Sequence, residues 1–306
     1  MEKGQQKISM ESTLKSLDTE EFIDIHFYRP IGYRWALLFN RLNISPNAVT
    51  LAAIVIGIAA GICFYYPDLM INIVGMVLLV WANSYDSADG QLARMTGKKS
   101  QLGRMLDGLC GIAWFIVIYL ALCFRLMPAW GVWIWVLAVP TGFFHGKQAG
   151  MADYYRNVHL FFLKGTNGSE LSDYATLKAR RQKMSWKHDF VDKLLDTYYI
   201  RYTRDQESLT PHFQQMKKIL REKYPKEVPE WFRATFRQQS LPLMKYTNML
   251  SFNTRVIALF VALFINQTWL YFVFELIVLN AMLIYMVVRH ERICAAFCKQ
   301  LIAEKS

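Results

Sequence analysis

The chain has 306 residues, a formal net charge of +11, and a hydrophobic fraction of 54%. Its hydrophobic residues gather in runs long enough to cross a bilayer as helices, which takes about 20 residues, and this excludes an ordinary soluble domain. A basic excess is typical of nucleic-acid binding or of contact with an anionic membrane. Because spanning runs are present, we favour membrane lipid as the partner and predict no nucleic-acid partner.

The apolar runs predict an all-α integral membrane protein with a bundle of six transmembrane helices. Residues 22–42 mix aromatic residues with arginines, which suits a helix that lies in the membrane interface; a helix packed on protein is the alternative. Ser45 is a suitable N-cap, and Pro46 a suitable first residue, for the first transmembrane helix. The six transmembrane helices are predicted at residues 46–65, 70–95, 102–124, 130–144, 254–265 and 269–288.

Basic residues are distributed unevenly among the predicted loops. The connection at 94–104, the segment 147–245 and the C-terminal tail are rich in Lys and Arg, whereas the loops on the other side of the membrane have only Arg125 beside them. Basic loops remain in the cytoplasm. We therefore predict that both termini, and the acidic segment next to residue 94, face the cytoplasm.

The apolar runs and the basic loops divide the chain into four segments. Residues 1–44 form an N-terminal cytoplasmic and interfacial segment, and residues 45–146 contain helices one to four. Residues 147–247 form a large cytoplasmic helical insert, and residues 248–306 contain helices five and six with a cytoplasmic tail. The insert is far longer than a usual connection, so we expect it to have structure of its own. It carries no catalytic signature.

The five cysteines predict no disulfide. Three of them fall in apolar runs, where cysteine usually behaves as a small hydrophobic residue. Cys294 and Cys298 lie one helical turn apart near the C-terminus. The sequence shows no set of further ligands that completes a metal site with them, so we predict none there.

Residues 83–111 lie between two apolar runs and carry Asp86, Asp89 and Asp107. Charged side chains at membrane depth are costly and by default mark a functional site. On helices, Asp86 and Asp89 share one face, and Asp107 lies on the facing side of the next helix. The three carboxylates could thus meet in one cavity, where hard oxygen ligands suit Mg²⁺ or Mn²⁺.

The segment 86–107 resembles the CDP-alcohol phosphatidyltransferase family, whose pattern is D-x2-D-G-x2-A-R-x8-G-x3-D-x3-D. Seven positions match with the correct spacing: Asp86, Asp89, Gly90, Ala93, Arg94, Gly103 and Asp107. The start of the first membrane helix, with Asn47, also resembles the family. The resemblance covers about residues 31–144, and the last two helices only by topology.

The resemblance implies a phospholipid-synthesis enzyme. An alcohol attacks the β-phosphate of a CDP-linked lipid such as CDP-diacylglycerol, and CMP leaves. It implies metal ligands at Asp86, Asp89 and Asp107, with catalytic roles for Asp89 and Asp107. The implied substrate-binding residues are Asn47, Gly90, Ala93, Arg94, Gly103 and Arg104. The acceptor is a polar alcohol; basic residues such as Arg104 favour inositol or a phosphorylated alcohol. The bacterial inner membrane is the expected location, and a homodimer is left open.

One position departs from the pattern: its last Asp, which the family uses as general base, is Gly111 here. Either another group takes the role, with Asp153 and His145 as candidates, or the chain is a catalytically silent member that acts as a nucleotide-lipid-binding scaffold. A transporter with intramembrane acids as ion sites is the third alternative. The Asp-Gly and Ala-Arg spacing argues against it, because ion coupling does not require that spacing.

Overall fold

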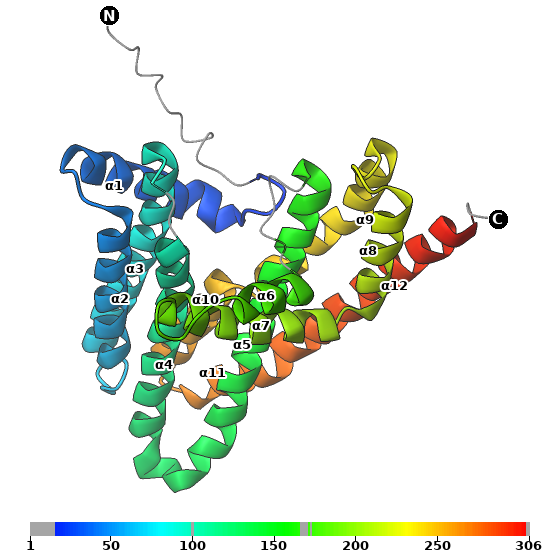
Figure 1. Cartoon of the computed structure of the whole chain (residues 1–306). Helices are drawn as coiled ribbons and strands as arrows, with labels where there is room; N and C mark the ends of the chain where they lie inside the picture. Colours follow the sequence, from blue (N-terminus) through cyan, green and yellow to red (C-terminus); the bar gives the residue numbers. More distant parts are fainter. Residues whose placement is uncertain (1–15, 99–100, 166–170, 172, 304–306) are drawn as a thin grey trace, which may run out of the picture. The chain divides into compact units, whose positions relative to one another are not determined.

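The computed structural model describes residues 16–98, 101–165, 171 and 173–303, and all regular elements in this part of the chain are helices (Figure 1). The chain forms two compact units. Unit 1 comprises Met1–Gly142 and Val256–Phe274, and unit 2 comprises Phe143–Arg255 and Glu275–Ser306.

Five helical segments of the described chain are long and apolar enough to cross a membrane. They are Pro46–Cys63, Leu69–Thr96, Leu106–Lys164, Glu230–Phe264 and Trp269–Ala303. The prediction of an all-helical integral membrane protein is confirmed. The third segment contains two helices, α4 (Gln101–Trp130) and α5 (Ile134–Lys164), on either side of a short turn, η3 (Gly131–Trp133). The count of six spanning helices therefore stays a prediction.

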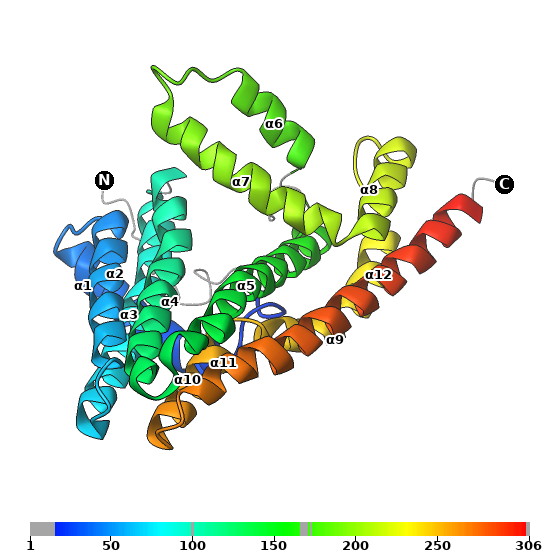
Figure 2. The ribbon, with the colours of Figure 1, turned by 90° about the horizontal axis from the view of Figure 1, so that it is seen from below.

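Unit 1 is built around three neighbouring helices, α2 (Pro46–Cys63), α3 (Leu69–Thr96) and α4, of which α2 contacts both others (Figure 2). The Ser45 side chain accepts a hydrogen bond from the backbone N–H of Ala48 at 3.3 Å, so the predicted N-cap of α2 is present. Asp68 caps α3 in the same way through the N–H of Ile71 at 3.0 Å. The helix α3 ends at Thr96, and the φ of 67° at the following Gly97 suits glycine at a helix C-cap.

Close packing of α2 against α4 depends on Gly57. A Cβ atom at this position would lie 2.1 Å from the indole Nε1 of Trp114. Without that atom, the buried Trp114 ring lies against α2, and its N–H donates to the carbonyl of Ala53 at 3.1 Å. Gly57 thus allows α2 to pack closely against the part of α4 that follows Asp107.

The N-terminal helix α1 (Arg29–Arg41) follows a π-helical turn, η2 (Asp24–Tyr28), and packs on α3. The amide of Gln91 donates to the carbonyl of Arg29 at 3.1 Å. A Cβ at Gly32 would lie 2.9 Å from Ser87 Oγ, so the two backbones approach closely. Helix α1 is therefore fixed on the part of α3 that carries the acidic motif; its predicted place in the membrane interface stays a prediction.

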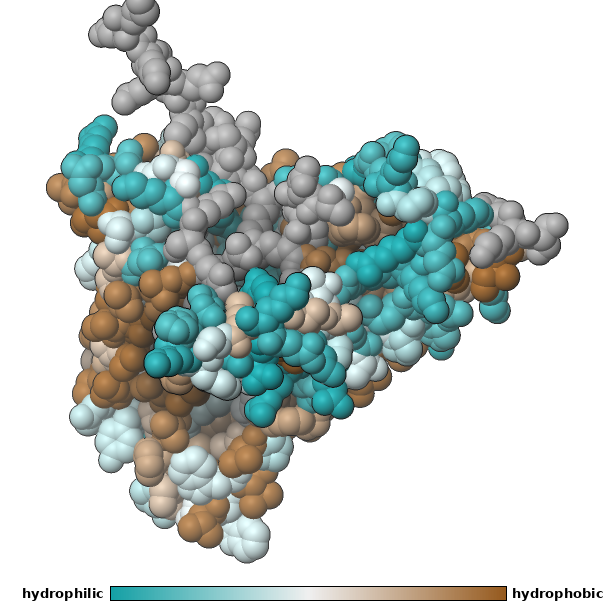
Figure 3. All heavy atoms as spheres, viewed as in Figure 1, coloured by the Kyte–Doolittle hydropathy of each residue, from teal (hydrophilic) through white to brown (hydrophobic). Residues whose placement is uncertain are grey.

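The outer face of unit 1 is apolar. Residues spaced by about one turn on α2 (Leu51, Val55, Ile62) and on α4 (Ile112, Ile116, Leu120) are exposed. Figure 3 shows hydrophobic residues gathered over this region, whereas hydrophilic residues cover the segment of α6 and α7. An exposed apolar face of this kind is stable in contact with lipid tails.

Arg125, the basic residue on the otherwise uncharged side, has acceptors within unit 1. Its guanidinium donates to the carbonyl of Phe64 at 3.1 Å and to the amide oxygens of Asn72 at 3.2 Å and Asn266 at 2.8 Å. These contacts join α4, the end of α2, the start of α3 and the loop before α11 (Trp269–Val273). The exception to the charge pattern thus has a structural role.

The described helices of unit 2 include α6 (Tyr174–Gln182), α7 (Phe190–Ser208), α8 (Pro211–Lys223) and α9 (Glu230–Met249). Helix α10 (Phe252–Phe264) begins in this unit, and η5 (Phe274–Leu279) leads into α12 (Asn280–Ala303). Helix α12 contacts α8 and α9, and α6 contacts α7. In Figure 2, α6 and α7 run side by side as a helical hairpin.

Helix α5 is much longer than the helix predicted at 130–144, because it continues to Lys164. The apolar run stops near Phe144, but the polar residues after it are buried with partners. Gln148 donates to the carbonyl of Glu275 at 3.1 Å, and His159 lies 2.8 Å from Ser240 Oγ. Hydropathy alone therefore misplaced the end of this helix.

Candidate active site

The three aspartates of the motif lie together in unit 1. Asp86 and Asp89 come from α3, and Asp107 comes from the start of α4. One carboxylate oxygen from each lies within 4.8 Å of the others. Asp89 is buried, Asp86 is half-buried and Asp107 is exposed, so the cluster opens toward the surface on the Asp107 side.

Asp89 is held in place by Thr50 of α2. The Thr50 hydroxyl forms a hydrogen bond with Asp89 Oδ2 and also lies 3.1 Å from the carbonyl of Pro46. Both side chains are buried, with 2% and 4% of their surface exposed. Thr50 belongs to the start of the first membrane helix, which resembles the family, but nothing in the sequence pattern assigned it a role in the site.

The cluster fits a divalent cation. Asp86 Oδ1 is buried and has no hydrogen-bond partner among the described residues. A buried acceptor without a partner costs roughly 1–3 kcal/mol and more when it is charged, and a cation removes this cost. Oxygens bound to one Mg²⁺ lie at most about 4.2 Å apart, so small side-chain rotations would close the cluster around an ion.

Arg94 lies on the same helix, one turn after Gly90. A Cβ atom at Gly90 would lie 3.3 and 3.4 Å from the two terminal nitrogens of the Arg94 guanidinium. The glycine therefore gives the planar group room beside the helix. Arg94 Nε and one terminal nitrogen are buried without a hydrogen-bond partner among the described residues. Free donors in a planar fork match the paired oxygens of a phosphate.

Comparison with known protein families matches residues 43–144, which contain α2, α3, α4 and all the motif positions. Over these residues the chain matches the CDP-alcohol phosphatidyltransferase domain model. The family resemblance predicted from the spacing of the motif is confirmed. No curated protein and no solved structure matches the chain.

The structure also places the other predicted substrate-binding residues of the transferase domain. Asn47 lies in the first turn of α2, Ala93 on α3 and Gly103 in the first turn of α4, and each is half-buried. Arg104 follows Gly103 on α4, but its side chain lies outside the described part of the structure. The substrate-binding roles of these four residues stay predictions.

Gly111 lies one helical turn after Asp107 on α4 of the transferase domain. A Cβ atom built there meets nothing within 4 Å. The fold therefore leaves room for a side chain where the family pattern has its last aspartate. Lack of space therefore does not explain why this position holds glycine and not aspartate.

The two candidate replacement bases lie on α5 in unit 2, where each has other partners. His145 Nδ1 lies 3.3 Å from Glu275 Oε2 and 2.8 Å from a guanidinium nitrogen of Arg255. Asp153 accepts hydrogen bonds from Asn157 at 3.1 Å and from the Tyr202 hydroxyl at 3.2 Å. Desolvation by burial, together with nearby Asp153, raises the pKa of Tyr202 well above its usual value, so this tyrosine stays a donor. The role of either residue as base stays a prediction.

Proposed function

We propose that the protein transfers a phosphatidyl-type group from a CDP-linked lipid to a polar alcohol and releases CMP. One observation carries the proposal. Inside the transferase domain, three carboxylates converge beside an arginine whose buried donors have no partner among the described residues. An acidic metal site next to a phosphate-binding fork is the arrangement that cleavage of a diphosphate requires.

Asp86, Asp89 and Asp107 would hold Mg²⁺ or Mn²⁺. When bound, the metal supplies charge neutralisation for the diphosphate and polarises the bond that breaks. Thr50 fixes the Asp89 carboxylate before substrate arrives, so little reorganisation is needed. Arg94 binds phosphate oxygens, and Gly90 allows them to approach the helix backbone.

In the transfer itself, the acceptor hydroxyl oxygen forms a bond to the β-phosphorus, and the bond from that phosphorus to the CMP oxygen breaks. The hydroxyl proton passes to a carboxylate. Because Asp107 is the exposed member of the cluster, we assign it the side that faces the acceptor. Arg104 on the same helix favours inositol or a phosphorylated alcohol as acceptor.

The basic connection between α3 and α4, with Lys98, Lys99 and Arg104, supports a site on the cytoplasmic side. That side is where a water-soluble acceptor and the CMP product would exchange. We further propose phospholipid biosynthesis in a bacterial inner membrane as the setting.

The experiment is CMP release by the purified protein in detergent or nanodiscs with CDP-diacylglycerol. A panel of inositol, inositol phosphate, glycerol phosphate, serine and choline is tested with Mg²⁺, with Mn²⁺ and with chelator. We expect release with one acceptor class and none with chelator. No release with any acceptor, from protein that still binds the CDP-lipid, would refute the transferase proposal.

The glycine at position 111 supports one competing function. The protein would be a catalytically silent family member that binds a nucleotide-lipid and acts as a scaffold. The open space at Gly111 is compatible with lost chemistry as well as with an acceptor that fills it. Binding without turnover in the assay above would select the scaffold. Turnover with any acceptor would exclude it.

A further inference from the structure

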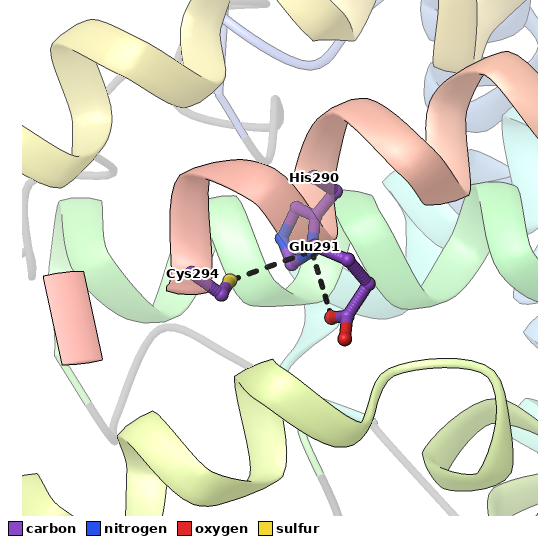
Figure 4. A group of neighbouring side chains, drawn as sticks. All are labelled: His290, Glu291 and Cys294. Carbon is purple, nitrogen blue, oxygen red and sulfur yellow. Dashed lines mark hydrogen bonds and ion pairs between the residues drawn. The ribbon is translucent and has the colours of Figure 1, made fainter. Parts of the chain in front are cut away.

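A second group of metal-ligand side chains lies in unit 2, on α12 (Figure 4). His290, Glu291 and Cys294 each offer one ligand atom, and the three atoms lie within 4.8 Å of one another. All three come from a single helix: His290 and Cys294 share a face at i and i+4, and Glu291 lies three residues before Cys294. All three residues are buried, with 2%, 9% and 0% of their surface exposed.

The sulfur–nitrogen distance fits a tetrahedral ion, and the nitrogen–oxygen distance would have to shorten by about 0.5 Å. Cys294 Sγ lies 3.6 Å from His290 Nδ1, and that nitrogen lies 3.9 Å from Glu291 Oε1. With Zn–S of about 2.3 Å and Zn–N of about 2.0–2.1 Å, tetrahedral ligands place sulfur and nitrogen about 3.5 Å apart. A thiol–imidazole hydrogen bond also explains that one distance. The Glu291 carboxylate beside the pair supplies the third ligand atom.

Glu291 is itself positioned by α8. Its carboxylate accepts hydrogen bonds from the backbone N–H groups of His212 at 2.6 Å and Phe213 at 3.3 Å, at the start of that helix. Ligands of structural metal sites are commonly oriented by such outer contacts. The rings of Tyr155 and Phe213 lie 4.5 and 5.6 Å from the His290 ring and exclude water from this side.

We propose that His290, Glu291 and Cys294 bind one divalent ion of the borderline-soft class, of which Zn²⁺ is the representative. Binding forms a metal–sulfur bond as the Cys294 thiol loses its proton to solvent. The thiolate and the carboxylate then balance the charge of the ion, which makes a buried site neutral. The mixed N, O, S donor set differs from the all-oxygen set of Asp86, Asp89 and Asp107, which suits a hard ion.

The site has a structural consequence. Because Glu291 both ligates the ion and caps α8, the ion would tie α12 to the start of α8. From the sequence we predicted no metal site near Cys294 and Cys298. The missed signal is His290, which lies one helical turn before Cys294.

The test is Co²⁺ titration of the full-length protein in nanodiscs after removal of metal by chelator. A Co²⁺–thiolate bond gives a near-ultraviolet charge-transfer band that carboxylates and imidazoles do not produce. With excess Mg²⁺ present to occupy the acidic cluster, we expect a band that saturates at one equivalent of Co²⁺, disappears on addition of Zn²⁺, and appears with release of a proton. Absence of the band in the native protein would overturn the proposal.

Substitutions of the proposed ligands test which cysteine forms the metal–sulfur bond. Cys294→Ser should lose the band, and His290→Ala should lower Co²⁺ affinity at least about tenfold. Glu291→Gln keeps an acceptor for the α8 amides, so it should fold while binding Co²⁺ about tenfold more weakly. The matched control is Cys123→Ala, which removes another buried cysteine and should keep the band. A band that survives Cys294→Ser, or is lost in Cys123→Ala, would refute the site.

Discussion

Two groups of charged side chains lie within candidate membrane-spanning segments, and they differ in how their charge is balanced. In unit 2, Arg255 donates to Glu275 at 2.8 Å, to the Gln148 side chain at 2.9 Å and to the carbonyl of Leu250 at 3.1 Å. In unit 1, buried atoms of Asp86 and Arg94 have no hydrogen-bond partner among the described residues. Buried charges that pair with each other inside the protein are typical of a structural role. Buried charges without a partner in the protein are typical of a site that binds a charged ligand.

The comparison predicts opposite effects of similar substitutions. Asp89→Asn should lower CMP release about 10³-fold, because a lost ligand weakens metal charge stabilisation by several kcal/mol. Folding should be preserved, since asparagine still accepts from Thr50. The measurement is CMP release under saturating Mg²⁺, alongside the melting midpoint.

Asp68→Asn is the matched control for this substitution. It lies on the exposed end of the same helix and keeps its capping function. Near-normal turnover in Asp89→Asn would contradict the assignment of Asp89 as a metal ligand.

The second substitution is Glu275→Gln, in the neutralised group. It leaves Arg255, which is 1% exposed, without its charge partner. Breaking a buried pair from one side typically costs about 3–5 kcal/mol. We expect a clear fall in the thermal unfolding midpoint in micelles.

The double variant Arg255→Met with Glu275→Met tests the cause, because removing both charges is often close to neutral. Its midpoint should lie well above that of Glu275→Gln. A Glu275→Gln protein with native stability would show that the pair is not structural, and the contrast between the two groups would fail.

Arg94→Lys sharpens the assignment of the phosphate site. Lysine keeps the charge but lacks the planar fork, so one charge-assisted hydrogen bond of about 1.5–3 kcal/mol is lost. We expect kcat/KM for the CDP-lipid to fall about 10- to 100-fold without loss of stability. An unchanged kcat/KM would mean that the unpartnered donors of Arg94 do not bind substrate.

The smallest effect is expected at Gly111→Asp. The space around the position admits the side chain, so the effect is electrostatic and not steric. One added negative charge near Asp107 costs about 1 kcal/mol in a water-exposed setting, which corresponds to about fivefold lower CMP release. Activity that appears only in the Asp form would instead identify the native chain as a scaffold.

The acidic cluster could be predicted because helical spacing alone places Asp86 and Asp89 on one face, and an apolar run on each side fixes the membrane context. The contact of Thr50 with Asp89 could not, because it depends on the approach of α2 to α3, which Gly75 permits: a Cβ there would lie 2.7 Å from the Phe64 ring. The length of α5 was missed because buried polar residues such as Gln148 end an apolar run without ending a helix.

The pairing of Arg255 with Glu275 also bears on how the chain is inserted during synthesis. The two residues enter the bilayer on successive helical segments, and Arg255 emerges from the ribosome first. A lone arginine in a membrane segment is costly, and this cost falls when its partner Glu275 arrives. The segment from Phe252 to Leu279 is therefore best inserted as one hairpin, and a nascent chain stopped before Glu275 would hold its last helix weakly in the lipid.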